Sequence, residues 1–138
     1  MLDAGWEIGS HGIKHKSLKT LSQTVLEREI YESKQYLEDR YNIEISWFAS
    51  PFGKVDKRIL KAVEKFGYSG CCGFYPFRLL ENEPFEYQIP RLSVYMIDSV
   101  KTVERKISRN WKELKTEVIK QILINFFSNA TILVDAIR

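Results

Sequence analysis

The chain has 138 residues, of which 44% are hydrophobic and 13% aromatic, so it is long enough to bury the core of a single domain. Its net charge of +3 is small, and basic residues alternate with acidic ones, so no basic block indicates nucleic-acid binding. The two cysteines, Cys71 and Cys72, are neighbours, which excludes a disulfide framework.

The first elements alternate between strand and helix. Residues Leu2 to Ile8 are predicted to form the closing turn of a helix, a turn at Gly5 and a short strand. A helix capped by Ser22 follows and ends near Tyr41, because its apolar residues recur at helical spacing. The apolar run Ile43–Ala49 predicts the next strand.

The pattern then repeats. Asp56 is expected to cap a helix that ends before Gly67, and Tyr68 to Gly73 is the third predicted strand. The proline-containing stretch from Phe74 to Tyr87 is typical of a long loop or lid, and the segment from Gln88 to Val94 is a short extended piece.

The C-terminal part is predicted to be helical. One helix begins after Asp98 or Ser99 and carries Trp111, and another runs from about Lys112 to Phe127. Residues 131–134 fit either a strand or further helix.

Strands that alternate with helices across short links indicate parallel βαβ units, so the fold class is α/β. We expect one domain that consists of a barrel portion, residues 1–98, and a C-terminal helical extension, residues 99–138.

The only histidines, His11 and His15, stand four residues apart after the first predicted strand. On a helical turn this spacing places two side chains roughly 5–6 Å apart on one face. Imidazole is a preferred ligand of zinc and related metals, although two histidines can also be structural. The pair is therefore a candidate metal site that needs a third ligand.

A second candidate segment follows the next strand, at Phe48–Gly53. Pro51 lacks an N–H and Gly53 permits a tight turn, so the backbone N–H of Phe52 is a candidate donor for a developing oxyanion. An ordinary strand-to-helix turn is the alternative interpretation.

Taken together and in this order, the two segments resemble the polysaccharide deacetylase family, carbohydrate esterase family four. Five stretches carry the resemblance: Gly5–His11 with His15, Leu21–Ser22, Phe48–Gly53, Phe66–Tyr68 and Ile89–Leu92. The resemblance implies a partial (β/α) barrel of the deacetylase type, and it spans roughly residues 4–94.

The family's activity gives the matching residues their expected roles. The resemblance implies that His11 and His15 bind a divalent metal, with zinc the expected ion, and that Phe52 supplies the oxyanion donor between Pro51 and Gly53. Family enzymes hydrolyse N-acetyl or O-acetyl groups on carbohydrate, such as a polymer of N-acetylglucosamine.

The sequence also departs from the family pattern. The aspartate motif of the first strand and the late histidine are absent, and Ala49 and Ser50 replace the arginine and tyrosine that precede the family's proline. We therefore expect an N-terminally truncated barrel whose first strand or strands are missing, inactive or weakly active by itself, with the third, aspartate, metal ligand lacking.

Two further interpretations stay open. A non-catalytic glycan-binding module would use lid aromatics, namely Phe74, Tyr75, Phe77, Phe85 and Tyr87. A homo-oligomer would cover the open barrel edge with a second copy. No signal peptide or membrane span is expected, which leaves the cytoplasm and the cell envelope of a bacterium or archaeon as compartments.

Overall fold

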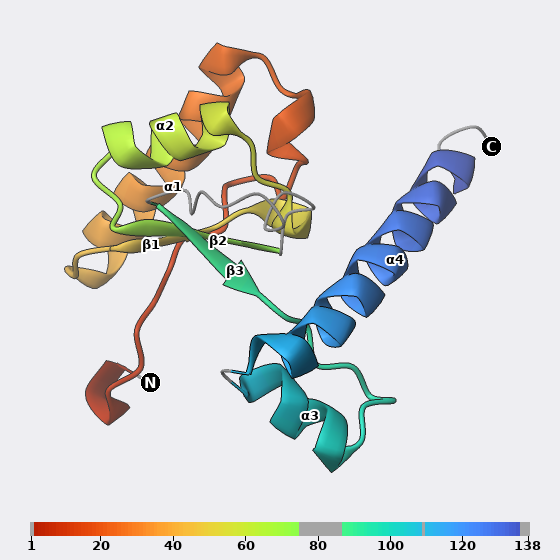
Figure 1. Ribbon diagram of the computed structural model, residues 1–138. Helices are drawn as coiled ribbons and strands as arrows, with labels where there is room; N and C mark the ends of the chain where they lie inside the picture. The colour runs from red at the N-terminus through yellow and green to blue at the C-terminus, as the bar shows by residue number, and fades with distance from the viewer. Residues whose placement is uncertain (1, 75–86, 109, 136–138) are drawn as a thin grey trace. The chain divides into compact units, whose positions relative to one another are not determined.

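The computed structural model describes residues 2–74, 87–108 and 110–135, and its backbone contacts divide them into two compact units (Figure 1). The first unit contains residues 2–74 and 87–90, and the second contains residues 91–108 and 110–135. Three of the predicted lid aromatics, Tyr75, Phe77 and Phe85, lie outside the described residues.

Helix α1, Gln23–Tyr41, begins and ends where the sequence predicts. Ser22 occupies the predicted N-cap position in an extended conformation, but its side chain makes no capping hydrogen bond. Asn42 ends the helix in the left-handed conformation, with φ of 51°. Asparagine tolerates this conformation better than most residues, and its own N–H returns to the carbonyl of Glu38, as at many helix C-termini.

Helix α2, Lys57–Lys65, has the predicted caps at both ends. The carboxylate of Asp56 accepts hydrogen bonds from the N–H groups of Arg58 and Ile59, each at 3.0 Å. These bonds satisfy two of the backbone donors that the first helical turn leaves unpaired. Just beyond the helix, Gly67 adopts φ of 71°, which glycine reaches without steric cost.

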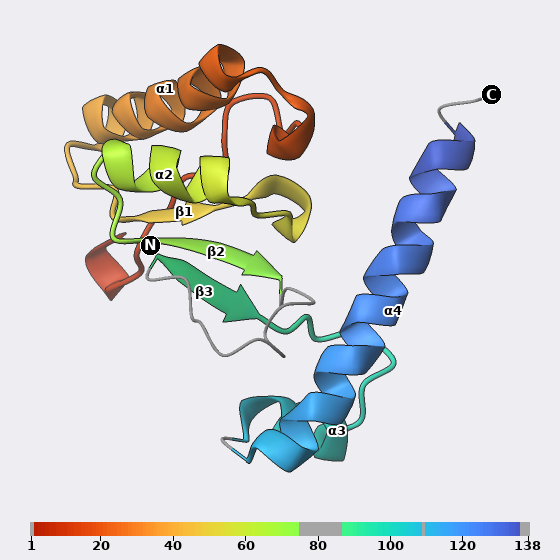
Figure 2. The same ribbon diagram turned by 45° about the horizontal axis from the view of Figure 1, so that its top comes forward.

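The sheet contains three strands in the order β1-β2-β3, with β1 at Trp47–Ala49, β2 at Gly70–Phe74 and β3 at Gln88–Arg91. Strands β1 and β2 are parallel, and Phe48 lies opposite Cys71. Helices α1 and α2 lie on the same side of the sheet (Figure 2), as expected for successive βα units.

Two predicted strands are shorter than expected. The run Ile43–Ala49 pairs only over its last three residues, as β1. Residues Leu2–Ala4 form a 3-10 turn, and the strand expected before the histidines is reduced to one parallel bridge between Ser10 and Phe48. Apolar sequence favours a strand, but a ladder also requires a neighbour along its whole length.

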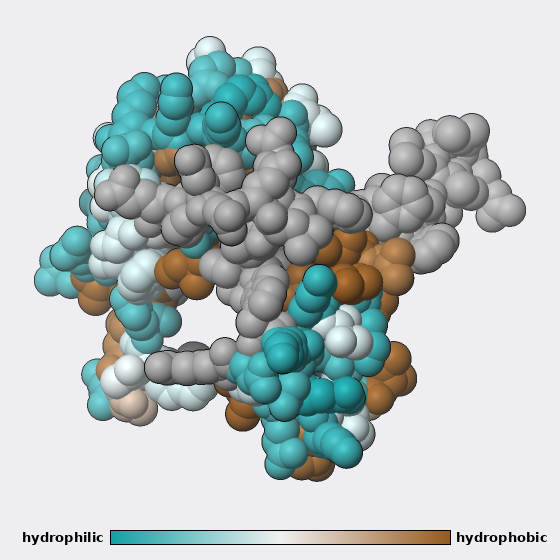
Figure 3. All heavy atoms as spheres, in the orientation of Figure 1, coloured by the Kyte–Doolittle hydropathy of each residue, from teal (hydrophilic) through white to brown (hydrophobic). Residues whose placement is uncertain are grey.

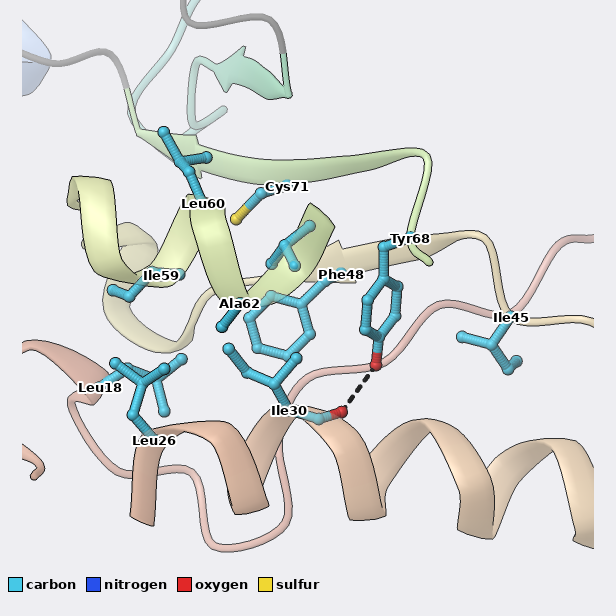
Figure 4. Packing of buried hydrophobic residues seen from close by; sticks show 11 residues of the cluster. Leu18, Leu26, Ile30, Ile45, Phe48, Ile59, Leu60, Ala62, Tyr68 and Cys71 are labelled. Carbon is cyan, nitrogen blue, oxygen red and sulfur yellow. Dashed lines mark hydrogen bonds between the residues drawn. The ribbon is translucent and has the colours of Figure 1, made fainter. Parts of the chain in front are cut away.

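The core of the first unit lies between α1, α2 and the sheet (Figure 4). The Phe48 ring contacts Tyr68 edge-on with centroids 5.6 Å apart, and the Tyr68 hydroxyl donates a hydrogen bond to the Ile30 carbonyl at 2.9 Å. The buried hydrophobic residues are Leu18, Leu26, Ile30, Ile45, Phe48, Ile59, Leu60, Ala62, Val63, Tyr68 and Cys71. This core fixes β1, and therefore the segment that follows it.

The second unit is a pair of helices, α3 at Val100–Ile107 and α4 at Trp111–Asp135. Trp111 is the first residue of α4, whereas the sequence pattern predicts it on the preceding helix. Helix α4 continues through residues 131–134, so this stretch is helix and not a strand. The buried Gln121 side chain accepts from the Ser93 N–H at 2.7 Å and donates to the Arg91 carbonyl at 3.2 Å, so it ties the preceding segment to α4.

Hydrophilic side chains dominate the surface over the start of α1 in the space-filling view (Figure 3). Among the residues that the structure describes, no helix has the length and apolar character needed to cross a bilayer.

Candidate metal centre

His11 and His15 lie close together, although neither is on a helix. Both are exposed in the loop after Ser10, and their ring centroids are 4.9 Å apart with a tilt of 55° between the planes. Gly12 and His15 have φ of 78° and 50°, and the chain bends between the two histidines. The helical-turn geometry assumed for the spacing is wrong for this loop, but the rings still meet.

The sheet orients the first of the two rings. The Nδ1 atom of His11 lies 2.5 Å from the carbonyl oxygen of Ala49, the last residue of β1. A carbonyl only accepts hydrogen bonds, so Nδ1 carries the proton. In a neutral imidazole the lone pair then resides on Nε2, and a carbonyl bond of this kind is the usual way in which a metal-binding histidine is oriented.

The separation of the rings fits two ligands of one tetrahedral ion. With metal–nitrogen distances of about 2.0 Å, two imidazoles on a tetrahedral centre have ring centroids about 5 Å apart. The observed 4.9 Å agrees with that value. Among the described residues, however, no group of three histidine, cysteine, aspartate or glutamate side chains could hold a metal ion. Within the described part of the chain, His11 and His15 are thus candidate ligands without a third candidate beside them.

The turn after β1 lies beside the histidines. The Phe52 ring centroid is 4.8 Å from that of His15. Pro51–Gly53 forms a 3-10 turn in which Phe52 adopts φ of 57° and ψ of 14°, an uncommon conformation for a residue other than glycine. Such conformations occur preferentially at functional sites, where the surrounding structure enforces them.

Two interactions hold this turn. The Ser50 hydroxyl donates to the Lys54 carbonyl at 2.5 Å, and the Gly53 N–H donates to the Ser50 carbonyl at 2.9 Å. Gly53 has φ of 62°, and a Cβ atom at this position would lie 2.3 Å from the Phe74 ring. Glycine is therefore required at this position both for its backbone conformation and for space.

One residue near the site was not predicted from the sequence. Glu29 of α1 is 4% exposed, and its Oε2 atom accepts hydrogen bonds from the N–H groups of Ile13 and Lys14, at 2.8 and 2.9 Å. These are two of the three residues between the histidines. No local signal identifies this contact, since a glutamate in an amphipathic helix is ordinarily solvated.

Below the loop, a second polar contact joins it to α1. The hydroxyl groups of Ser10 and Ser33 are 2.6 Å apart, and both residues are buried. Nearby, burial raises the pKa of Tyr68, so its hydroxyl stays protonated and can donate to the Ile30 carbonyl. The histidine loop is thus anchored to both β1 and α1.

A model of the family described as polysaccharide deacetylase matches residues 1–71. Among solved structures, a polysaccharide deacetylase from Bacillus cereus is 22% identical, with a TM-score of 0.64, and the alignment covers 78% of this chain and 34% of that one. A putative polysaccharide deacetylase from Bacillus anthracis gives 23% identity, a TM-score of 0.64 and the same coverage of 78% and 34%.

A family 4 carbohydrate esterase from Streptomyces lividans, solved in complex with acetate, is 20% identical with a TM-score of 0.50, over 54% of this chain and 38% of that one. No curated protein matches the chain. The chain spans about a third of the length of the solved structures that it matches. The similarity to the two Bacillus structures confirms the predicted partial (β/α) barrel of the deacetylase type.

Proposed function

This chain belongs to the polysaccharide deacetylase family, and from that premise we propose that it carries the two-histidine part of a metal-dependent site that hydrolyses acetyl groups on carbohydrate. The substrate class is an N-acetylated or O-acetylated glycan, such as a polymer of N-acetylglucosamine. The Streptomyces lividans esterase was solved with acetate, which is the acid that such a reaction releases.

One observation carries the proposal. The rings of His11 and His15 lie 4.9 Å apart, directly after the bridge that pairs Ser10 with β1, and next to the turn that follows β1. Residues that follow neighbouring parallel strands gather at the carboxyl ends of those strands, where (β/α) barrels carry their active sites. This arrangement supports the proposal that the two segments singled out in the sequence form one site.

His11 and His15 would hold the ion, with zinc as the expected metal. His11 is already oriented for this role by its Nδ1–H bond to Ala49, which leaves Nε2 available. A divalent ion bound there supplies a Lewis acid for an acetyl carbonyl and for the attacking water.

The turn after β1 would serve the acetyl group itself. In this proposal the backbone N–H of Phe52 binds the oxygen on which negative charge develops. Pro51 and Gly53 shape the turn, and the left-handed conformation of Phe52 sets the direction of its N–H. Because the hydrogen bonds of Ser50 hold this turn, the donor would need little reorganisation during the reaction.

The site needs at least one more ligand, since two imidazoles do not complete a zinc coordination shell. We propose an aspartate as the third ligand, as the family pattern implies; the residues of this chain outside the described ones include no aspartate, so another segment or another chain would supply it. We also propose a homo-oligomer, in which a second copy of the chain covers the sheet edge beside Ser10. Light scattering tests it, and a strictly monomeric mass would count against it.

Elemental analysis tests the metal site directly. The chain is equilibrated with Zn²⁺, dialysed and assayed for bound zinc, together with His11→Ala and His15→Ala. Each histidine variant should retain less zinc than the parent, because each removes one of two ligands. Lys14→Ala is the matched control, because it changes an exposed side chain of the same loop and keeps the backbone N–H that Glu29 binds. Equal zinc in the parent and both histidine variants would contradict the proposal.

A further inference from the structure

The segment between the two histidines folds around one buried carboxylate. Oε2 of Glu29 accepts the N–H groups of Ile13 and Lys14, and a Cβ atom at Gly12 would lie 3.4 Å from the same oxygen. Glu29 projects from α1, which the core holds through Leu26 and Ile30 on either side of it. The carboxylate thus connects a rigid helix to the histidine loop.

Glu29 is poorly suited to a purely structural role in the core. Burying a carboxylate costs free energy unless strong hydrogen bonds compensate for the lost water. Two consecutive backbone N–H groups directed at one anionic oxygen supply such bonds. Among the described residues no ion pair to a cation accompanies them, so the loop backbone is the partner that the structure shows for this charge.

The loop conformation itself needs support. Gly12 and His15, on either side of the two bonded residues, both have positive φ. For a histidine this conformation is unfavourable and persists only where neighbouring interactions enforce it. The two bonds to Glu29 act on the residues between these turns, and so they fix how His15 faces His11.

We propose that Glu29 is a positioning residue, which holds the loop so that both imidazoles face one metal ion. The inference rests on the proposed metal site. The two hydrogen bonds from the loop to Glu29, however, should hold the loop in the metal-free protein as well. Carboxylate contacts behind metal ligands commonly tune affinity, and their loss typically weakens binding by about 10–100-fold.

The first test compares Zn²⁺ affinities by calorimetric titration of the full chain. Glu29→Ala should bind zinc about 10-fold or more weakly than the parent. The matched control is Glu32→Ala on the same helix, whose side chain is 44% exposed and pairs with Arg28. This control should keep the parent affinity, and an unchanged affinity in Glu29→Ala would overturn the inference.

Glu29→Gln provides a second variant in case the alanine variant fails to fold. Its amide oxygen can accept the same two N–H groups but lacks the charge, so its affinity should fall between those of the parent and the alanine variant. A glutamine variant that folds and binds zinc as tightly as the parent, with the loop amides equally protected, would contradict a positioning role for the carboxylate.

Amide hydrogen exchange without metal separates this inference from the proposed function. The Ile13 and Lys14 amides should exchange slowly in the parent and in Glu32→Ala, and faster in Glu29→Gln or Glu29→Ala. If the parent binds no zinc but these amides lose protection, the metal proposal fails and the structural role of Glu29 stands. If their protection does not change, the inference fails even where the parent binds zinc.

Discussion

Replacing Gly53 by alanine tests how tightly the turn after β1 is built. Gly53 and Gly67 both have positive φ, of 62° and 71°. A Cβ at Gly53 would lie 2.3 Å from the Phe74 ring, whereas nothing lies within 4 Å of a Cβ at Gly67. The two variants therefore share the backbone cost and differ in the clash.

The expected magnitudes follow from these two terms. A left-handed alanine costs about 1–2 kcal/mol relative to glycine, and this cost applies to both variants. Forcing an extra methyl group into a packed site adds about 1–3 kcal/mol, and this addition applies to Gly53→Ala alone. Gly53→Ala should therefore destabilise the chain by about 1–3 kcal/mol more than Gly67→Ala.

Urea unfolding followed by far-ultraviolet circular dichroism measures the difference, with parent, Gly53→Ala and Gly67→Ala compared at one pH. Equal midpoints and slopes for the two variants would refute the reasoning, because the Phe74 contact would then contribute nothing. A Gly53→Ala variant that folds should also have a displaced Phe52, which the ring resonances of the neighbouring His15 report.

Two further predictions concern the core and the second unit. Tyr68→Phe removes the hydroxyl that donates to the Ile30 carbonyl, and it should lower the free energy of unfolding by about 1 kcal/mol. The control is Tyr31→Phe, at an exposed tyrosine, which should cost almost nothing. Equal costs for the two variants in urea titrations would show that the hydrogen bond is not stabilising. The Lys106 ammonium lowers the pKa of Asp98, so this pair stabilises the folded state above about pH 4, and the contribution is lost as the pH falls through the lowered pKa. On acidification from neutral pH to about pH 3, the free energy of unfolding should therefore fall less in Asp98→Asn than in the parent. An identical fall in the two proteins would contradict the role of the pair.

Local signals predicted the helices well. The helix ends are defined by residues within a few positions of them, namely Asp56, Asn42 and Gly67. A single sequence therefore contains the information needed to predict where these helices begin and end. The parallel pairing of β1 with β2 also follows from the alternation of elements, because short links between strand, helix and strand permit little else.

The site was predicted only in part. The sequence placed the two histidines and Phe52 after successive predicted strands. In the structure the His15 ring centroid lies 4.9 Å from that of His11 and 4.8 Å from that of Phe52. The contact from Glu29 could not be predicted, because it joins residues 16 and 15 positions apart and depends on how α1 packs. Strand lengths failed for a similar reason, since a strand needs a paired neighbour as well as apolar sequence.

The central claim is that His11 and His15 bind one metal ion. Nitrogen NMR of the two histidine rings during titration with Zn²⁺ tests it most directly, because these are the only histidines in the chain. We predict that both rings shift with one common midpoint, and that the His11 signal changes at Nε2 while Nδ1 stays protonated against Ala49. Separate midpoints for the two rings, or a response from one ring alone, would contradict a shared site.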